Sequence, residues 1–245
     1  MSRLALYLLG PPRVELDGEP IHIGRRKALA LLAYLSGTPD SHRRDSLATL
    51  LWPDYDQSSA RAHLRRALVS LTNRLGSQWF VADRETMGIY PDSGIWLDVA
   101  QFRQKLAECE THGHAAHAAC PACLATLTEA TELYRDDFLA GFSLPDSLPF
   151  DEWQRNQTES LRGDLGSVLG RLSASHAAQG EYNQAFAAAQ RWLELDPLYE
   201  AAQRHIMVLY SSNGQQTAAL RQYELCERTL AEELGVPPSA ETTSL

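Results

Sequence analysis

The stretch QSSARAHLRRALVSLTNRLG, residues 57–76, decides the fold of the first part of this chain. Its leucines recur at the spacing of one face of an α-helix. They are Leu64, Leu68, Leu71 and Leu75. Ser58 or Ser59 is expected to cap the N-terminus of the helix. The stretch therefore predicts a long helix that buries one face in a core and leaves the other to solvent or a partner.

The face opposite these leucines carries side chains that can contact bases in the major groove of DNA. Arginine pairs with guanine, asparagine pairs with adenine, and a small apolar group contacts the methyl group of thymine. The residues expected to contact bases are Arg65, Arg66, Val69 and Asn73. A solvated basic face without any partner is the alternative explanation of the same pattern.

The segments around this helix complete a winged-helix pattern. Residues 26–36 and 45–52 predict two shorter helices, which stop at Gly37 and at Pro53. Residues 79–91, WFVADRETMGIYP, predict a β-hairpin directly after the long helix. Three helices followed by a hairpin are typical of a winged helix.

The first residues predict a small sheet in front of these helices. Residues 4–10, LALYLLG, alternate between two faces as a strand does. Residues 14–18, VELDG, end in Asp17-Gly18, which favours a tight hairpin turn. The third strand is expected in IHIG, residues 21–24.

The net charge of −9 is divided unevenly along the chain. Residues 1–97 carry a net charge of +2, and residues 98–245 carry −11. Positive charge is therefore concentrated where phosphate contacts would form, whereas the acidic second part discourages non-specific DNA binding. The arginines expected to contact the DNA backbone are Arg25, Arg26, Arg44, Arg61, Arg74 and Arg84.

The second part of the chain contains a helical repeat. Residues 179–197 match the tetratricopeptide pattern, with Gly180 in the turn between helices. A shift by the 34-residue period of that repeat places Gly214 on Gly180, so a second, less regular unit follows. Residues 98–108 and 124–138 predict another helix pair. Stacked helix pairs usually bind protein, although they can also support dimerisation or pack on the winged helix.

A loop rich in cysteine and histidine, CETHGHAAHAACPAC (residues 109–123), offers soft ligands to a metal ion. Its CxxC pair can hold one zinc ion, and another cysteine and a histidine can complete a tetrahedron. The expected zinc ligands are Cys109, His112, Cys120 and Cys123, with His114 and His117 as alternative histidines. Solvated loop residues without a metal are the other explanation, because a single CxxC is a weaker signal than two.

Catalytic and membrane functions find no support in the sequence. It lacks the motifs of phosphate-binding loops, serine hydrolases and zinc proteases, so we expect no enzymatic activity. The longest apolar run, residues 28–35, is too short to cross a membrane. The N-terminal apolar segment is too short for a secretory signal, so a cytoplasmic location is expected.

Several blocks of the sequence, taken in order, resemble the antibiotic regulatory protein (SARP) family of bacterial activators. LLGPPRVELDG, GRRKALALLAYL, LATLLWP and SSARAHLRRALVSLTNRLG resemble its OmpR-type DNA-binding domain. LYRDDFLAGFSLPDSLPFDEW, RWLELDPLYEAAQRHIMVLY and ALRQYELCERTLAEELGVPPSAET resemble its bacterial transcriptional activator domain. The resemblance implies binding at direct repeats in promoters, recruitment of RNA polymerase and pairing of two copies on DNA.

We therefore expect an α+β winged helix-turn-helix domain at residues 1–97, followed by an all-α tetratricopeptide-like domain at residues 98–245. The expected function is that of a transcriptional activator whose partners are double-stranded promoter DNA, RNA polymerase and a second copy of the chain. A structural zinc ion is the one cofactor considered. Two alternatives remain, namely a protein-interaction or signalling module and the N-terminal part of a larger regulator that contains an ATPase.

Overall fold

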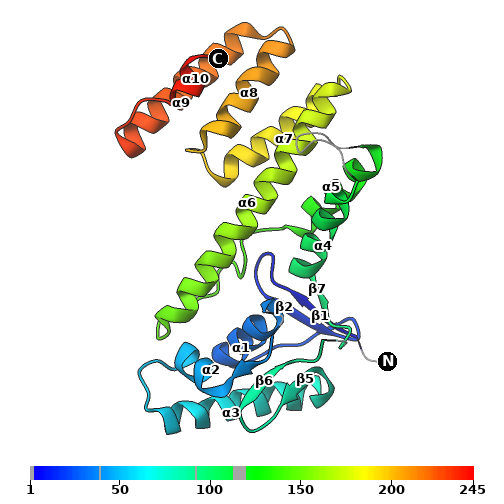
Figure 1. Ribbon diagram of the computed structural model, residues 1–245, viewed down its shortest axis with the longest axis vertical. Helices are drawn as coiled ribbons and strands as arrows, with labels where there is room; N and C mark the ends of the chain where they lie inside the picture. The colour runs from blue at the N-terminus through cyan, green and yellow to red at the C-terminus, as the bar shows by residue number, and fades with distance from the viewer. Residues whose placement is uncertain (1–2, 39, 92, 113–119) are drawn as a thin grey trace. The chain divides into compact units, whose positions relative to one another are not determined.

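The computed structural model describes residues 3–38, 40–91, 93–112 and 120–245 (Figure 1). Strands and three α-helices occupy the chain up to Leu97. From Asp98 onward the regular elements of the described residues are helices. The expected class, a winged helix followed by an all-helical part, is confirmed.

The first part contains the strands β1 (Leu4–Tyr7), β2 (Arg13–Leu16), β3 (Glu19–Pro20), β4 (His42–Arg43), β5 (Phe80–Ala82), β6 (Thr86–Ile89) and β7 (Trp96–Leu97). Its helices are α1 (Arg26–Gly37), α2 (Arg44–Leu51), α3 (Gln57–Leu75) and the short 3-10 helix η1 (Ser77–Trp79). The helices that follow are α4 (Asp98–Glu110), α5 (Pro121–Leu133), α6 (Leu148–Ala178), α7 (Tyr182–Leu195), α8 (Glu200–Ser212), α9 (Gln216–Leu234) and α10 (Ala240–Thr243).

The N-terminal sheet has the strand order β3-β2-β1-β7. The predicted turn between β2 and β3 is confirmed, with Asp17 and Gly18 both at positive φ, 55° and 87°. The expected third strand was placed too late, because a two-residue turn sets Glu19 directly opposite Leu16 and the pairing ends at Pro20. Strand β7 pairs parallel with β1 and was not anticipated.

Helices α1, α2 and α3 and the hairpin β5–β6 form the winged helix, and β4 adds a third strand to the hairpin (Figure 1). The buried residues of α3 are Ala60, Leu64, Ala67, Leu71 and Leu75. Leu68 is only half-buried, so alanines occupy part of the face that the leucine spacing predicted. The expected serine cap was wrong: the Asp56 carboxylate accepts the N–H groups of Ser58 and Ser59.

The chain folds into two compact units, residues 1–104 with 133–161 and residues 105–132 with 162–245. The segment 133–161 joins the first unit through its backbone. The Leu139 N–H donates to the Leu8 carbonyl at 2.8 Å, and the Gly10 N–H donates to the Asp137 carbonyl at 3.1 Å. Residues 133–161, from the second half of the chain, thus pack with the winged helix. The domain boundary expected at residue 97 stays a prediction.

Helix α5 is shorter than the sequence pattern predicted. The expected helix over residues 124–138 ends at Leu133. Phe138 instead forms bridges with Leu9 and Gly10, and its ring packs edge-on against Trp153, with 5.5 Å between ring centroids. Residues beyond Leu133 therefore serve the core of the first unit rather than a helix pair.

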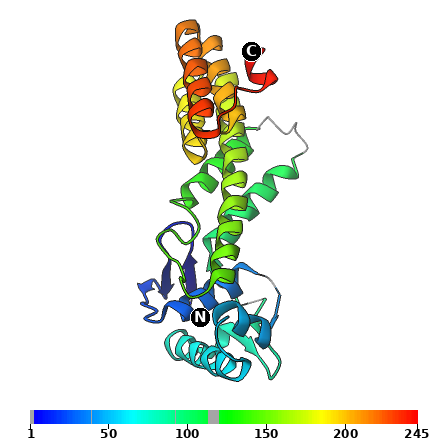
Figure 2. The same ribbon diagram turned by 90° about the vertical axis from the view of Figure 1, so that its left-hand side faces the viewer.

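The second unit contains the expected helical repeats. Gly180 and Gly214 have φ angles of 76° and 73° and lie in the turns before α7 and α9. Glycine adopts this left-handed conformation without strain, which explains the 34-residue recurrence of glycine. Helix α8 packs against both α7 and α9 (Figure 2). Among the described residues, no helix is both long and apolar enough to cross a lipid bilayer.

Candidate nucleic-acid interface and cysteine–histidine cluster

The outer face of α3 presents all four residues expected to contact bases. Arg65, Arg66 and Asn73 are exposed, and Val69 is 50% exposed. Val69 lies opposite the buried stripe, where an apolar β-branched side chain has no part in the core. Its exposure leaves it accessible to a partner, such as the methyl group of a thymine.

Arg66 is positioned by an aromatic residue that sequence reasoning missed. Its Nη2 donates to Nδ1 of His63 at 3.1 Å. The His63 ring stacks on Trp52 and meets Tyr55 edge-on, with centroid distances of 5.8 and 4.8 Å. Burial lowers the pKa of His63, and the cations Arg66 and Lys27 lower it further. The ring is therefore neutral near pH 7, and its Nδ1 can accept the hydrogen bond.

Two hollows in the first unit concentrate positive charge on either side of α3. One of about 530 Å³ is lined by Arg25, Arg26, Lys27 and Arg66, with Asp146 as its acidic group. The other, of about 310 Å³, has the arginines Arg44, Arg61, Arg65 and Arg84 in its lining. Clustered cations of this kind attract the phosphates of a nucleic acid, and Arg65 borders the same hollow as three of the expected backbone contacts.

Three of the six arginines expected at the DNA backbone also hold the fold together. Arg61 forms an ion pair with Asp45, and this contact and a hydrogen bond from Gln57 lower the pKa of Asp45 to about 2. Arg44 donates from Nε to the Asp83 carbonyl at 2.8 Å and so fastens the hairpin. Arg26 donates to the Ser143 carbonyl at 2.5 Å.

The other three of these arginines are exposed at the edges of the winged helix. Arg25 is the N-cap residue of α1, and Arg74 lies in the last turn of α3. Arg84 lies between β5 and β6, at the tip of the hairpin. These positions suit contacts with phosphates, which fix the register of a protein on DNA without reading its sequence.

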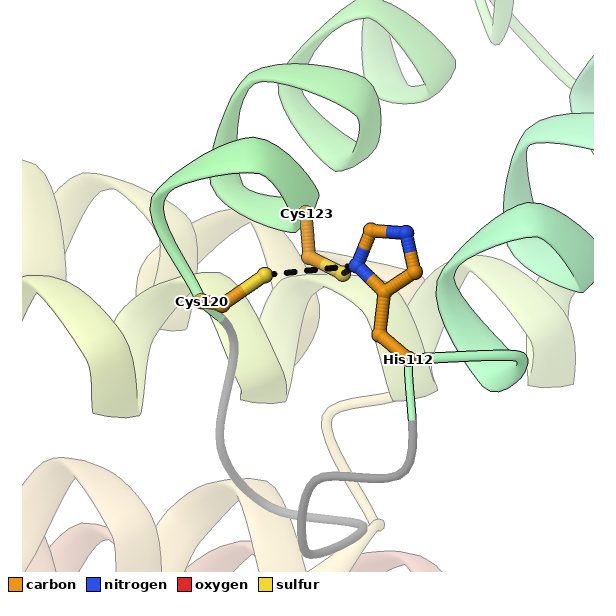
Figure 3. A group of neighbouring side chains, drawn as sticks. All are labelled: His112, Cys120 and Cys123. Atoms are coloured by element: carbon orange, nitrogen blue, oxygen red, sulfur yellow. Dashed lines mark hydrogen bonds between the residues drawn. The ribbon is translucent and has the colours of Figure 1, made fainter.

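Three of the four expected zinc ligands lie together in the second unit (Figure 3). Nδ1 of His112 is 3.3 Å from Sγ of Cys120 and 3.1 Å from Sγ of Cys123. All three donor atoms lie within 4.8 Å of one another. His112 follows the end of α4, whereas the two cysteines lie at the start of α5, so the cluster joins two helices.

The expected ligand Cys109 lies next to this group but is not part of it. Its Sγ contacts the carbonyl of Cys123 at 3.9 Å, and Sγ of Cys123 contacts the carbonyl of Cys109 at the same distance. Both side chains are buried in an apolar cluster with Leu127, Val168 and Leu172. The alternative ligands His114 and His117 lie outside the described residues.

The two thiols of the CxxC pair differ in acidity. A hydrogen bond from the main chain of Cys123 and another with His112 lower the pKa of Cys120 to about 6. Burial raises the pKa of Cys123 to about 12, with the thiols of Cys109 and Cys120 adding to the effect. Cys120 is therefore the thiol that loses its proton first.

Comparison with models of protein families matches residues 97–245 to the family described as "Bacterial transcriptional activator domain". Among solved structures, the chain is similar to EmbR of Mycobacterium tuberculosis in complex with a low-affinity phosphopeptide, with a TM-score of 0.78 and 23% sequence identity. The match covers 100% of this chain and 64% of the EmbR chain, and at this identity it shows a shared fold. A search of curated proteins finds no match.

Proposed function

The chain belongs to the bacterial transcriptional activator domain family, as the resemblance to SARP-type regulators implied, and from this premise we propose that it binds promoter DNA sequence-specifically. In this proposal α3 enters the major groove and the exposed arginines around it contact the backbone. The helical part then recruits RNA polymerase or pairs two copies of the chain. Regulation of this kind needs no catalysis, and a regulator of promoters acts in the cytoplasm of a bacterium.

The outer face of α3 is the observation that carries the proposal. It combines an exposed valine with an amide and two arginines, and cationic hollows lie on both sides of it. A single exposed apolar side chain is ordinary on a protein surface, so Val69 supports the proposal through its place among the arginines and the amide of the same helix face. The net charge of +2 over residues 1–97 is modest, but the positive groups are concentrated at this surface.

Selection of bound fragments from a pool of random DNA duplexes tests the proposal directly. The full chain should enrich one motif, and two copies should recur as a direct repeat spaced by about one helical turn, roughly 10 to 10.5 base pairs. If no motif is enriched at a salt concentration where binding persists, the winged helix does not read sequence. The chain is then better explained as a protein-interaction or signalling module.

Replacing Arg66 with alanine should weaken binding to the selected motif by about 1–3 kcal/mol, roughly 5- to 150-fold in Kd. The loss should come with relaxed preference at one base pair, because the guanidinium is proposed to contact a single base. Competition binding against duplexes changed at each position measures both effects. Arg155→Ala, which removes an exposed arginine from α6, is the matched control. An Arg66→Ala protein with unchanged base preference contradicts the assignment.

Replacing Arg84 with alanine should weaken binding to all duplexes alike. A contact with one phosphate releases about one counterion, so the slope of log K against log salt should become less steep by about one. Titrations of a specific and an unrelated duplex over a series of salt concentrations measure the slope. A loss confined to the specific duplex contradicts the role assigned to Arg84. Arg84 is preferred to Arg44 here because Arg44 also holds the hairpin.

A role within a larger regulator stays a proposal of its own. The chain spans 64% of the length of the EmbR chain that it matches, so the activity of a longer protein is not transferred to it. DNA selection with the full chain is informative whether the chain acts alone or within a larger regulator, because the proposed task of the winged helix, reading a DNA motif, is the same in both.

A further inference from the structure

We propose that His112, Cys120 and Cys123 bind a structural zinc ion that ties the end of α4 to the start of α5. The proposal rests on the geometry of three donor atoms in the second unit and is independent of DNA binding. One imidazole nitrogen and two sulfurs are the donors that zinc prefers in structural sites. The chemical class of ligand is thus a soft divalent cation with tetrahedral preference.

The spacing of the three donors is close to that of a tetrahedral zinc site. Tetrahedral bonds of about 2.3 Å to sulfur and about 2.0–2.1 Å to nitrogen set the nitrogen–sulfur separation near about 3.6 Å and the sulfur–sulfur separation near about 3.8 Å. The separations from Nδ1 of His112 to the two sulfurs are 3.3 and 3.1 Å, and all donors lie within 4.8 Å. The two nitrogen–sulfur separations differ from the tetrahedral value by about 0.3–0.5 Å, and the sulfur–sulfur separation, which is at most 4.8 Å, needs to shorten by up to about 1 Å, which side-chain rotation can supply.

The surroundings also suit a structural ion. Cys123 is fully buried against Leu127, Val168 and Leu172, while His112 is exposed, so the site lies at the edge of an apolar cluster. Leu106 of α4 and Leu124 of α5 pack against the same cluster, so the site adjoins the contact between the two helices. Since metal binding and folding are linked, an ion here would stabilise the junction of the two helices.

Cys109 is the residue that we assign as the fourth ligand, because closed structural zinc sites have four protein ligands. It shares the buried cluster with Cys123, and the two residues contact each other through sulfur and carbonyl atoms at 3.9 Å. Its sulfur would have to turn toward the group of three to complete the site. A dithiol–disulfide pair at Cys120 and Cys123 is the competing explanation, and the experiment separates the two.

The first measurement is the zinc content of the full chain, purified without chelators from cells grown with zinc. We expect about one equivalent in the unaltered protein and less than about a tenth in the Cys120→Ser, Cys123→Ser double variant. Cys226→Ala is the matched control, since Cys226 is a buried cysteine of the same unit that lies in a separate apolar cluster. Its zinc content should stay near one equivalent. Less than a tenth in the unaltered protein, or full zinc in the double variant, overturns the proposal.

The second measurement does not depend on folding of a variant. Titration of the metal-free full chain with Co²⁺ should produce the visible absorption of a tetrahedral cobalt site and the near-ultraviolet bands of thiolate ligands. An octahedral spectrum without thiolate bands overturns the proposal. So does a disulfide between Cys120 and Cys123 that mass spectrometry finds in protein isolated without oxidant.

The Cys109→Ser variant decides the fourth ligand. Weaker cobalt binding with reduced thiolate bands supports three sulfurs and one nitrogen. Cobalt binding and bands equal to those of the unaltered chain overturn the assignment of Cys109 and leave the site with two cysteine ligands. His112→Ala should weaken cobalt binding at least about tenfold, because even the loss of a group that only supports a ligand typically costs about 10- to 100-fold in metal affinity. His22→Ala, at an exposed histidine of the other unit, should leave cobalt binding unchanged.

Discussion

Replacing Asp98 with alanine should lower the free energy of unfolding of the first unit by about 2–5 kcal/mol. The carboxylate is 1% exposed and accepts three main-chain N–H groups. Leu8 donates at 2.8 and 2.9 Å to its two oxygens, and Leu9 and Val99 donate at 2.9 Å. Alanine would leave the buried N–H groups of Leu8 and Leu9 without an acceptor, which costs about 1–3 kcal/mol for each group.

The ionisable carboxyl group of Asp98 lies in a buried place, and the net effect of its surroundings is to raise its pKa above the ordinary value. Burial raises the pKa of Asp98, while the three N–H donors and Arg135 lower it. The Arg135 guanidinium lies 3.6 Å from a carboxylate oxygen. Because the hydrogen bonds all come from N–H donors, they require an acceptor at each oxygen, and the amide of asparagine can supply only one.

Urea denaturation of the full chain, followed by tryptophan fluorescence, measures this effect, since Trp96 lies two residues before Asp98. Asp98→Asn should fall between the alanine variant and the unaltered protein. Asp54→Ala, at an exposed aspartate of the same unit, should change stability by less than about 0.5 kcal/mol. An Asp98→Ala protein as stable as the Asp54→Ala protein would show that the N–H groups find other acceptors.

The sequence was sufficient for the elements whose signals are local. The period of the leucines in α3, the Asp17-Gly18 turn and the recurrence of Gly180 and Gly214 each depend on a few neighbouring residues. A buried helix face needs apolar residues at helical spacing, and a left-handed turn favours glycine, whatever the rest of the fold. These predictions were therefore confirmed although they used no tertiary contact.

The sequence was insufficient where a partner lies far along the chain. Strand β7 pairs with β1 although most of the first unit separates them in sequence, and the segment 133–161 packs with the winged helix. Neither contact has a local pattern, because it depends on which surfaces meet after folding. The N-cap residue Asp56 was missed for a different reason. Several polar residues in a row can cap this helix, and which of them does so depends on the residue at which the helix starts.

The residues of the candidate sites could also be predicted from local sequence patterns, whereas their contacts with other side chains could not. Helical periodicity identified the exposed residues of α3, but it could not show that Arg61 is paired with Asp45 or that His63 supports Arg66. The CxxC pair and His112 were recognised from spacing, and these three residues lie together. The place of Cys109, which faces main-chain atoms instead, depends on a rotamer that spacing does not specify.

Removing the second unit should abolish activation of transcription while DNA binding remains. The test protein joins residues 1–104 to residues 133–161 through a flexible linker in place of residues 105–132, because the first unit consists of these two segments. A simple truncation at Leu97 would remove Asp98 and the segment that packs against residues 8–10, so its failure would report unfolding. The second unit, residues 105–132 and 162–245, carries 7 basic and 14 acidic residues and so a net charge of −7, which phosphates repel, so its proposed task is contact with RNA polymerase or a second copy.

In a reporter strain that carries the selected DNA motif, the full chain should raise expression and the shortened protein should leave it at background. In a gel-shift assay, the shortened protein should still bind the motif, more weakly if pairing of two copies is lost. The shortened protein with Arg66→Ala is the control, since it should lose binding as the full-length variant does. Activation by the shortened protein at the level of the full chain would contradict the proposal, because residues 105–132 and 162–245 would then act as a sensor or a brake rather than as the activating surface.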